Sequence, residues 1–534
     1  MPPRRRPKFT GLFHDDVVTD SYWIREQGEL RLPPLDGVKQ LAVIGELLPP
    51  APGNPTAAGD IGLRIFHDAR EIIAREALPV GPFRFNLNLS TPGSPAGSTL
   101  TLQLVGVAAS NLSAWLGRVT GAKPLQPWRG QARNRRLRIQ RIEADGEILF
   151  DFGNRSSLWN SAFSRRHLKV GLNVIGWFRA DLGIGESARC MARAADAAGL
   201  APALVDMKLP CKNPQSDDSF AARLQADAPY PVNVFHVDPP GMRDIDHHHG
   251  AALRQGRYNV GYWAWELPEF PDAWIDCTDY CQEVWAPSRF AAEAIAEKIP
   301  LPVLTMPHAI SFARPTGDHR AKFGLPAGSY LFLFLYDLNS YAERKNPAAV
   351  IEAFRRSGLA GHGASLVIKT HNAAGNPADL ARLQAAAADL PGTTLITQTL
   401  SRTELYELES ACDCFVSLHR SEGFGLAVAE CMFLGKPVIS TNWSATAEFV
   451  HAGNGCPVDC TLVTLDRNHG PYAKGQTWAA PDPGHAAEWM HRLWEDRALG
   501  QRLGAAARQT IEERFSPTVI GARYRRRLEA IAGW

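Results

Sequence analysis

Several things that the chain lacks, or has little of, narrow its class. It has 534 residues but only nine cysteines, which is typical of a protein from a reducing compartment rather than of a disulfide framework. No apolar run reaches about 18 residues, so the sequence predicts no membrane-spanning helix. The basic start, Met1–Arg6, is not followed by an apolar stretch. We therefore expect no signal peptide and a cytoplasmic location.

The composition is otherwise ordinary, with 45% hydrophobic and 21% charged residues. These fractions exclude a disordered, collagen-like or highly charged chain. The length is sufficient for several domains of about 150 residues each. A composition of this kind indicates a globular protein with large buried cores.

Acidic residues are missing from one long stretch, because no Asp or Glu occurs between Leu78 and Ile142. Six arginines crowd its end: Arg129, Arg133, Arg135, Arg136, Arg138 and Arg141. Residues 1–168 hold 22 Lys and Arg against 15 Asp and Glu, whereas the rest of the chain is net acidic. We favour a solvated strand face. The alternative is an anionic partner, namely a glycan, a lipid-linked acceptor or the inner face of a membrane, with peripheral attachment. We expect no nucleic-acid partner.

The first third of the chain has the alternation of half-buried strands. Phe83–Leu89 and Thr99–Val105 alternate apolar and polar residues. The pair Asp145-Gly146 separates two further alternating runs, which is a strong hairpin signal. We predict mostly antiparallel β structure over 80–155, as a small sandwich, within a β-rich accessory domain 1–167 of unknown role.

The pattern changes near Leu168, where continuous apolar runs begin to alternate with helical segments. Val170–Trp177 and Tyr330–Tyr336 are such runs, as expected for strands buried on both faces. The alternation predicts an α/β fold with two doubly wound Rossmann-like domains, 168–315 and 316–534, facing a cleft. We expect the last helix to pack back on the first of these domains. Ligands in such folds bind at the carboxyl ends of the strands.

The most informative segment runs from a predicted strand, Cys414–Leu418, through a glycine loop to a helix that begins near Leu426. Such a helix N-terminus exposes free backbone N–H groups and a positive dipole end, which suit an anionic ligand. Glu422 and Glu430 lie eight positions apart across this loop and first turn. A carboxylate accepts paired hydrogen bonds from vicinal hydroxyls, so two of them here favour a sugar nucleotide. The alternative is an ordinary loop with surface glutamates.

Several motifs together resemble one known family. Glu422-Gly423-Phe424-Gly425-Leu426, then Glu430, Gly435-Lys436-Pro437-Val438 and Glu448, resemble the Glu-x7-Glu segment of retaining GT-B glycosyltransferases of family 4, or glycosyltransferase group 1. Phe334–Ser340 leading to Arg344-Lys345-Asn346-Pro347 resembles the opening of their C-terminal domain. Trp263–Pro268, Glu283–Ser288, Met306–His308 and Trp478–Asp482 are similar to a bacterial branch that makes surface polysaccharides. The resemblance covers about 169–534 and leaves out the first third.

The resemblance implies a role for each matching residue. Glu430 is expected to hold the ribose hydroxyls, and Glu422 with the backbone of Gly423, Phe424, Gly425 and Leu426 to contact the donor sugar. Lys345 and Arg344 are expected to neutralise the diphosphate, so that the catalytic set is Glu422, Lys345 and Arg344. The loop Asp181–Glu186, with Gly183 and Gly185, resembles the glycine loop that approaches the diphosphate, and Ser340 is placed in the donor site with it.

The sequence departs from the family at two places. Many members have Gly-Arg where this chain has Tyr336-Asp337, and that arginine helps to bind the diphosphate, so Arg344 is our candidate substitute. Many members also place a donor-facing histidine at the end of a middle N-domain strand. The comparable strand here continues into Trp265 and Glu266, to which we give a pocket role. Core aromatics beside a surface glutamate are an equal alternative.

Other candidate sites are weaker. His308 is either a cleft residue or a loop histidine. The Asp244-Ile245-Asp246 segment lacks a leading apolar strand, so we interpret it as a solvated loop and predict no metal site. The pairs Cys277 with Cys281 and Cys456 with Cys460 lack the further ligands of a zinc site, so we expect buried or free thiols.

The function expected from the resemblance is transfer of a sugar, with retention, from a nucleotide-diphosphate sugar to a glycan or lipid-linked acceptor. The resemblance implies that 168–315 is the acceptor-side domain and that 316–534 binds the nucleotide sugar. The enzyme is predicted to be a hexosyltransferase, with mannose as one candidate sugar, a UDP- or GDP-linked donor and no required cofactor. Two alternatives remain: a non-catalytic GT-B scaffold with a glycan-binding N-terminal module, and a GT-B sugar-nucleotide epimerase. The retained Glu422, Glu430 and Lys345 argue against lost activity.

Overall fold

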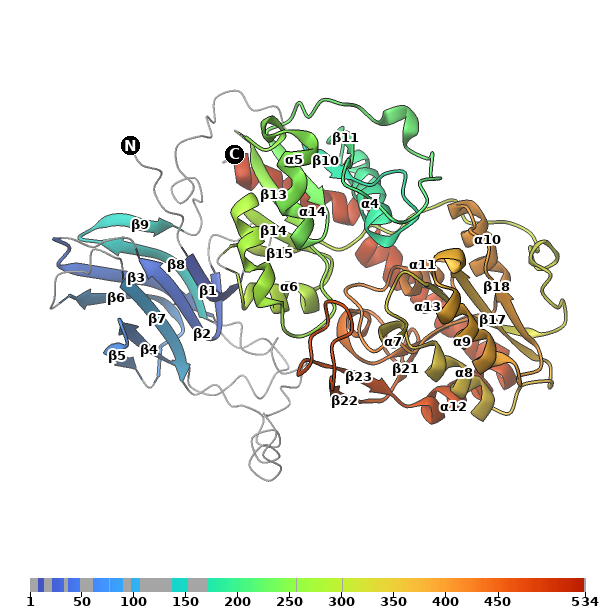
Figure 1. Cartoon of the computed structure of the whole chain (residues 1–534). Coiled ribbons are helices and arrows are strands. Elements are labelled where there is room, and N and C mark those ends of the chain that lie inside the picture. The colour runs from blue at the N-terminus through green and yellow to red at the C-terminus, as the bar shows by residue number, and fades with distance from the viewer. Residues whose placement is uncertain are drawn as a thin grey trace.

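The computed structural model of the chain shows a β-rich unit followed by two α/β domains (Figure 1). It describes residues 8–13, 22–32, 37–48, 61–75, 77–89, 98–105, 137–151, 171–255, 257–299 and 301–532. The predicted boundary between 167 and 168 lies outside these residues, as do Arg129, Arg133, Arg135 and Arg136.

The β-rich unit is an antiparallel sheet of nine strands in the order β5-β4-β7-β2-β8-β3-β6, with β1 beside β2 and β9 beside β8. The strand β2 joins two halves of this sheet, because its start pairs with β8 and its later part pairs with β7. The strands are β1 Lys8–Phe13, β2 Tyr22–Leu32, β3 Gln40–Leu47, β4 Gly62–His67, β5 Arg70–Arg75, β6 Gly81–Asn88, β7 Ser98–Val105, β8 Leu137–Ala144 and β9 Glu147–Asp151.

Both halves of this sheet contribute to one apolar core. Leu63 and Leu102 come from one half, and Val43 and Ile139 from the other, and all four are fully buried. The predicted antiparallel β structure is therefore confirmed, although the strands begin well before residue 80. The halves face one core as in the predicted sandwich, but hydrogen bonds through β2 join them into one sheet.

Two described arginines of this unit share one acidic partner. Arg84 donates a hydrogen bond of 2.8 Å to Glu143, and Arg141 lies 3.5 Å from the other oxygen of the same carboxylate. The side chains of Arg84 and Arg141 are nearly half exposed. Arg141, one of the six clustered arginines, is therefore paired and partly exposed, as is typical of surface ion pairs.

The first α/β domain contains a parallel sheet of six strands in the order β11-β10-β12-β13-β14-β15. The sequence forms these strands because their residues are apolar on both faces, and β10, β12, β13 and β14 are buried along their whole length. The elements are β10 Asn173–Gly176, α4 Gly183–Ala197, β11 Ala203–Asp206, β12 Val232–His236, α5 Ile245–His249, β13 Tyr258–Tyr262, β14 Glu283–Ala286, α6 Arg289–Ala296 and β15 Val303–Thr305.

The second α/β domain repeats this plan with the order β18-β17-β16-β19-β20-β21, and a two-stranded sheet, β22-β23, is added at its side. Its strands are β16 Tyr330–Asp337, β17 Ala364–His371, β18 Thr393–Ile396, β19 Cys414–Ser417, β20 Val438–Thr441, β21 Cys456–Val458, β22 Cys460–Thr464 and β23 Thr477–Pro481. Its helices are α7 Ala342–Lys345, α8 Pro347–Arg356, α9 Pro377–Ala387, α10 Arg402–Ala411, α11 Leu426–Phe433, α12 Pro483–Glu495, α13 Arg497–Phe515 and α14 Pro517–Ala532.

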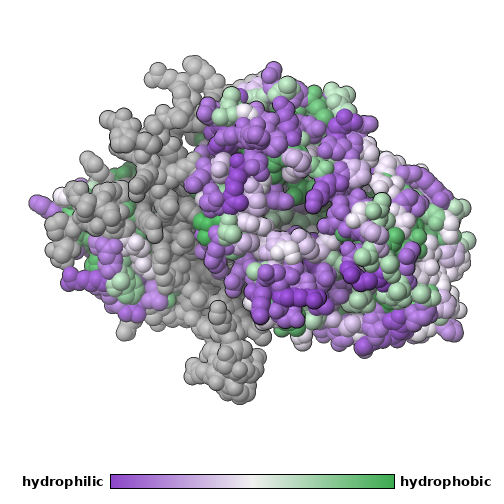
Figure 2. All heavy atoms as spheres, in the orientation of Figure 1, coloured by the Kyte–Doolittle hydropathy of each residue, from purple (hydrophilic) through white to green (hydrophobic). Residues whose placement is uncertain are grey.

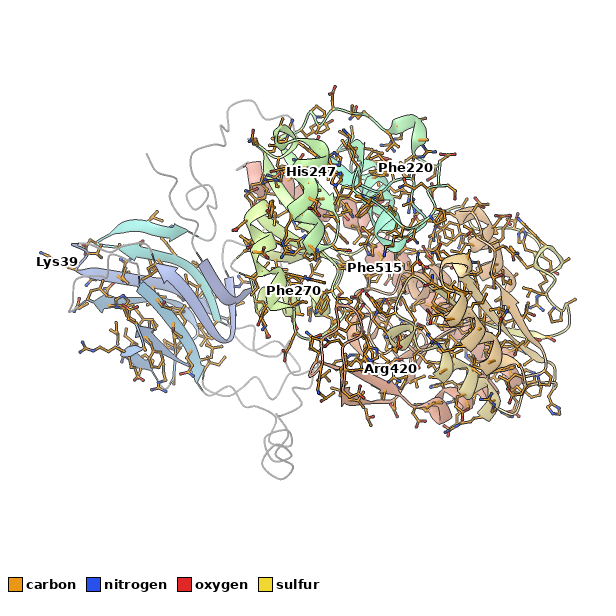
Figure 3. All side chains as sticks on the ribbon, viewed as in Figure 1. Lys39, Phe220, His247, Phe270, Arg420 and Phe515 are labelled. Atoms are coloured by element: carbon orange, nitrogen blue, oxygen red, sulfur yellow. The ribbon has the colours of Figure 1, made fainter. Side chains whose placement is uncertain are left out.

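The C-terminal helix α14 crosses to the first α/β domain and packs against α4 (Figure 1). Arg527 of α14 forms a buried ion pair with Glu283 of β14, and Tyr524 stacks on Trp285 at 5.5 Å. Phe515, labelled in Figure 3, lies where the two domains meet, and its carbonyl accepts a hydrogen bond from Ile310 N. These contacts make the C-terminal segment a shared part of both domains.

Three findings about the described residues concern the expected thiols, metal sites and membrane-spanning helices. All nine cysteines are free thiols, and seven of them are buried. No group of three or more His, Cys, Asp or Glu side chains in the described part of the chain is arranged to hold a metal ion. None of the helices described has both the length and the hydropathy needed to cross a bilayer.

Candidate functional site

A cleft of about 810 Å³ lies between the two α/β domains and receives residues from both. The surface is visibly hollowed between these domains, with hydrophobic residues inside a hydrophilic rim (Figure 2). The carboxyl ends of β12 and β13 meet it from one side, and those of β16 and β19 from the other. The cleft is lined by all but one of the predicted site residues: Glu422, Lys345, Arg344, Gly423, Phe424, Gly425, Leu426, Glu430, Gly183, Ser340, Trp265, Glu266 and His308.

The exception is Gly185, which does not line the cleft. A Cβ atom there would lie 2.7 Å from the carbonyl oxygens of both Ala180 and Trp177. The glycine therefore lets the first turn of α4 pack tightly against the preceding loop. Its contribution to the site is the position of that helix.

Two helices begin at the cleft without a side-chain cap. Gly425 precedes α11 with φ of 94°, and a Cβ there would lie 2.6 Å from Thr446, so the position requires glycine. Leu182 precedes α4 and likewise offers no side-chain acceptor to the free N–H groups. Both N-termini are adjacent to lining residues of the same cleft. Two helix dipoles and their free N–H groups therefore favour an anion between them.

Glu422 lies between the two predicted cations. Its Oε1 is 2.5 Å from Lys345 Nζ, and its Oε2 is 3.3 Å from Arg344 Nη1. Burial by itself raises the pKa of Glu422, but Lys345 and Arg344 outweigh this effect and hold the pKa at about 2. The loop is fixed by Ser444 Oγ, which accepts a 2.9 Å hydrogen bond from Glu422 N. Glu422 is therefore a fixed carboxylate anion at neutral pH.

Arg344 is enclosed by protein. Its Nη1 donates a 2.8 Å hydrogen bond to the carbonyl of Ser421, and its Nη2 lies 3.8 Å from Glu266 of the other domain. Its guanidinium also lies 5.8 Å from the centre of the Tyr472 ring. Arg344 therefore holds the Glu422 loop and links it to the opposite side of the cleft.

Glu430 has a partner that the sequence interpretation missed. Arg402, the first residue of α10, donates a hydrogen bond to Glu430 Oε1. It donates another, of 2.7 Å, to the hydroxyl of Tyr406. Glu409 follows on the same face of α10, fully enclosed and without a hydrogen-bond partner among the described residues. Burial raises the pKa of Glu409 well above its usual value. Polar residues at helical spacing, 402, 406 and 409, were the signal available in the sequence.

Glu186, in the first turn of α4, is the carboxylate of the first α/β domain that also contacts Arg402. Its Oε2 accepts a 2.8 Å hydrogen bond from Arg189, its Oε1 contacts Arg193, and Arg402 Nε lies 3.5 Å away from across the cleft. Burial raises the pKa of Glu186, but the three arginines outweigh it and the net pKa is well below the usual value. A continuous network of charges thus joins α4, α10 and α11.

Asp337 stands where the resemblance led us to expect an arginine. It accepts hydrogen bonds of 2.8 Å from Asn213 of the first α/β domain and 2.6 Å from Asn372, and His371 lies 3.3 Å away. Burial raises its pKa, but His371 and the hydrogen bonds outweigh this and bring the pKa to about 2. The position therefore supplies a bridge between the domains instead of a cation.

Trp265 and Glu266 belong to a contact between the domains. Trp265 is 1% exposed and its Nε1 donates a 2.8 Å hydrogen bond to the carbonyl of Glu269. Glu266 Oε2 accepts a 3.1 Å hydrogen bond from Tyr472, which comes from the loop between β22 and β23. Trp265 is mainly a core residue, whereas the Glu266 carboxylate borders the cleft.

His308 packs against the glycine loop of the opposite domain. Its ring lies 4.8 Å from that of Phe424, and its Nδ1 is 3.2 Å from the hydroxyl of Tyr262. Burial lowers the pKa of His308 to about 3, so the ring is neutral at physiological pH. Since it lines the cleft, it presents an uncharged polar edge there.

Two further carboxylates were not singled out as site residues by the sequence. Asp238, just after β12, reaches the cleft without any hydrogen-bond or ion-pair partner among the described residues. Although the residue is exposed to the cleft, desolvation by the surrounding protein, followed by the charge of Glu266, raises its pKa to about 6. Glu448 lies away from the cleft and accepts hydrogen bonds from Phe290 N at 2.8 Å and Arg289 N at 3.2 Å, so it caps α6 of the other domain.

These features of the second α/β domain can be compared with known proteins. Residues 316–510 match the family model of glycosyl transferases group 1. The matched segment includes Arg344, Lys345, Glu422, Glu430 and Arg402. No curated protein matches the chain.

The whole two-domain arrangement also resembles solved structures. A glycosyltransferase from Rickettsia africae aligns with a TM-score of 0.50 and 13% sequence identity, over 68% of this chain and 99% of that one. HepE from Anabaena, in complex with UDP and glucose, gives a TM-score of 0.48 at 13% identity, over 67% of this chain and 98% of that one. Sucrose-phosphate synthase from Thermosynechococcus elongatus gives 0.48 at 15% identity, over 66% and 97%. The two parallel sheets and the Rickettsia likeness establish the GT-B fold, preceded by the β-rich unit.

Proposed function

We propose that the protein is a glycosyltransferase that moves a sugar from a nucleotide-diphosphate sugar to a hydroxyl of a glycan or lipid-linked acceptor, with retention of anomeric configuration. One observation carries this proposal. Two uncapped helix N-termini, from α4 and α11, border one cleft together with Lys345, Glu422 and Glu430. A diphosphate satisfies free N–H groups and a lysine, and carboxylates accept hydrogen bonds from sugar hydroxyls. The match of 316–510 to glycosyl transferases group 1 supports the same function.

In this proposal the donor lies mainly on the second α/β domain. Glu430 accepts hydrogen bonds from the ribose hydroxyls, and the diphosphate lies between the helix N-termini, near Gly183, Ser340 and Lys345. The donor sugar lies against Glu422 and the backbone of 423–426. The proposed donor is a UDP- or GDP-linked hexose, with mannose as one candidate sugar. Lys345 stabilises the charge that develops on the leaving phosphate, which is the kind of term that dominates many enzymatic rate enhancements.

The state of Glu422 bears on the proposed chemistry. Because Lys345 and Arg344 keep its pKa at about 2, Glu422 is a weak base and carries no proton at neutral pH. In the proposed step the bond from the sugar C1 to the leaving phosphate oxygen breaks. The acceptor oxygen bonds to C1 from the same face, and its proton passes to the leaving phosphate oxygen. This route requires no side-chain base, and domain closure excludes competing water.

A thermal-shift screen with nucleoside diphosphates tests the proposal. A ligand present at 100 times its dissociation constant stabilises the folded state by about 2.7 kcal/mol. We expect a clear rise in the melting temperature with UDP or GDP and none with a non-nucleotide anion such as sulfate at the same concentration. The absence of any shift with UDP, GDP and ADP contradicts the proposal.

Retention needs a separate measurement. The product formed from an α-linked nucleotide sugar is expected to carry an α-linkage, as shown by the NMR coupling of its anomeric proton. A β-linked product leaves the transferase function standing but overturns the same-face mechanism.

A further inference from the structure

The donor site has fewer free cations than the sequence suggested. Arg344 has a side chain 7% exposed, and it is committed to Ser421, Glu422 and Glu266. Lys345 shares Glu422 with it. A nucleoside diphosphate brings more than one negative charge, so the proposed donor requires a further positive group beside Lys345.

Three arginines line the cleft, and they differ in how open they are. The side chains of Arg189 and Arg344 are 2% and 7% exposed, whereas that of Arg402 is 27% exposed. Arg402 also lies between the two helix N-termini, because it contacts Glu186 in the first turn of α4 and Glu430 in α11. Among these arginines, Arg402 is therefore the one placed to meet an anion in the cleft.

The ion pair between Arg402 and Glu430 has polar atoms without a hydrogen-bond partner among the described residues, and these indicate what it binds. Nη2 of Arg402 is occupied by Glu430 and Tyr406, but no described residue accepts a hydrogen bond from Nη1. Likewise Glu430 Oε1 is occupied, while no described residue donates to Oε2. The pair thus offers one free donor edge and one free acceptor oxygen side by side. This matches a ligand that has an anionic oxygen close to a hydroxyl, as a ribose 5′-diphosphate has.

We propose that Arg402 is a nucleotide-binding residue whose Nη1 edge binds a diphosphate oxygen while Nη2 holds Glu430 for the ribose. The inference rests on the proposed function and adds to it a residue at the start of α10. Arg402 thereby supplies the positive charge that is absent at Asp337. Because Arg402 also contacts Glu186, a nucleotide bound in this way lies beside the junction of the two α/β domains.

The alternative is that Arg402 serves only to neutralise Glu430 and Glu186. A merely structural arginine stabilises the fold and the position of Glu430, so its loss weakens nucleoside and nucleoside diphosphate to the same extent. A phosphate-binding arginine affects the diphosphate more than the nucleoside. The ratio of the two dissociation constants therefore separates the two roles.

The experiment is isothermal titration calorimetry on the full-length protein with UDP, uridine, GDP and guanosine. Arg402→Gln is compared with wild type, and Arg402→Lys tests whether charge without the planar fork restores binding. Arg382→Gln is the matched control, since Arg382 is exposed in α9 and pairs with Asp379. Melting temperatures of all variants establish that each one folds.

We expect Arg402→Gln to weaken the preferred nucleoside diphosphate about tenfold or more, while its nucleoside changes by less than about threefold. Arg402→Lys is expected to recover part of the loss, and Arg382→Gln to bind like wild type. If wild type binds the diphosphate but Arg402→Gln keeps the wild-type ratio, or loses both ligands equally, the assignment of Arg402 is overturned. If wild type binds neither UDP nor GDP, the proposed function itself fails.

Discussion

The two sides of the cleft differ in how their polar groups are satisfied. On the second α/β domain, Lys345, Arg344 and Arg402 are each paired with a carboxylate, Glu422 or Glu430. The side formed by the first domain has a different character near the ends of β12 and β13. There Asp238 has no partner among the described residues, and the buried ring of His308 is neutral at physiological pH.

Under the proposed function, this difference corresponds to a division of labour between the two domains. Paired charges hold one another in fixed positions, which suits a ligand whose charged part is always the same, such as a diphosphate. An unpaired carboxylate beside neutral polar groups suits hydroxyls, whose arrangement varies from one sugar to another. The match to the family model of glycosyl transferases group 1, over residues 316–510, also lies in the second domain. The following predictions test the division, from the largest expected effect to the smallest.

Lys345→Ala is expected to have the largest effect on the charged side. The variant loses the cation beside the leaving phosphate, and removal of such an electrostatic contact typically lowers kcat by about 10²- to 10³-fold. Initial rates of sugar transfer at saturating donor measure this. Lys322→Ala is the control, because Lys322 is nearly half exposed and pairs with Glu404 and Glu407. A variant that keeps wild-type kcat removes Lys345 from the catalytic set.

Glu430→Gln is expected to affect binding more than chemistry. The amide keeps one acceptor oxygen but loses the charge that holds Arg402 and the ribose, so the dissociation constant of the nucleotide should rise about tenfold. Calorimetric titration with the preferred nucleoside diphosphate measures the change. Glu488→Gln, on the exposed face of α12, provides the control. Unchanged affinity in Glu430→Gln contradicts the ribose assignment.

Asp238→Asn probes the other side of the cleft. We expect nucleotide affinity within about twofold of wild type and a fall of about fivefold in transfer to the acceptor, since one hydrogen bond from an acceptor hydroxyl is weakened. Because the pKa of Asp238 is about 6, wild-type transfer should rise as the pH passes through that value and the carboxylate ionises. The variant should lack this rise.

The result for Asp238→Asn also tests the comparison between the two sides of the cleft. If Asp238→Asn weakens nucleotide binding as strongly as Glu430→Gln does, both sides hold the donor and the division of labour is wrong. If it leaves both binding and transfer unchanged, the unpaired carboxylate has no part in the site.

Glu448→Gln is expected to have the smallest effect, on the junction between the domains. Burial raises the pKa of Glu448 to about 7, so the folded state retains a proton that the unfolded chain releases near pH 4.5. Wild-type stability should therefore fall as the pH rises from about 5 to 7.5, and the amide variant should lack this contribution. The melting temperature of wild type relative to the variant should decrease by a few degrees over that interval. A constant difference contradicts the inferred protonation.

The sequence predicted the local elements of the two α/β domains closely. The predicted run Val170–Trp177 contains β10, Asn173–Gly176. The run Tyr330–Tyr336 matches β16, Tyr330–Asp337, to within one residue, and α11 begins at Leu426 as expected. The reason is that a strand buried on both faces is a continuous apolar run, and a glycine before a helix is required by the backbone at Gly425. Such signals lie within a few neighbouring residues.

The position of site residues was partly predictable in the same way. Residues that follow strand ends, such as the loop from His419 to Gly425, reach the cleft because parallel strands share one carboxyl edge. The sequence could not show that Arg344 is enclosed or that Gly185 serves packing, because both depend on chain segments that are distant in sequence. Arg344 contacts Ser421 and Glu266, and the contact with Glu266 comes from the other domain.

The sequence by itself determined the α/β alternation, the helix start near Leu426 and the identity of the carboxylates Glu422 and Glu430. Only the tertiary structure decided their chemical states. It placed Arg402 on Glu430, Asn213 on Asp337 and the Glu448 carboxylate on α6. The physical reason is that propensity and apolar periodicity act over a few residues, whereas charge pairing and desolvation depend on groups brought together from separate domains.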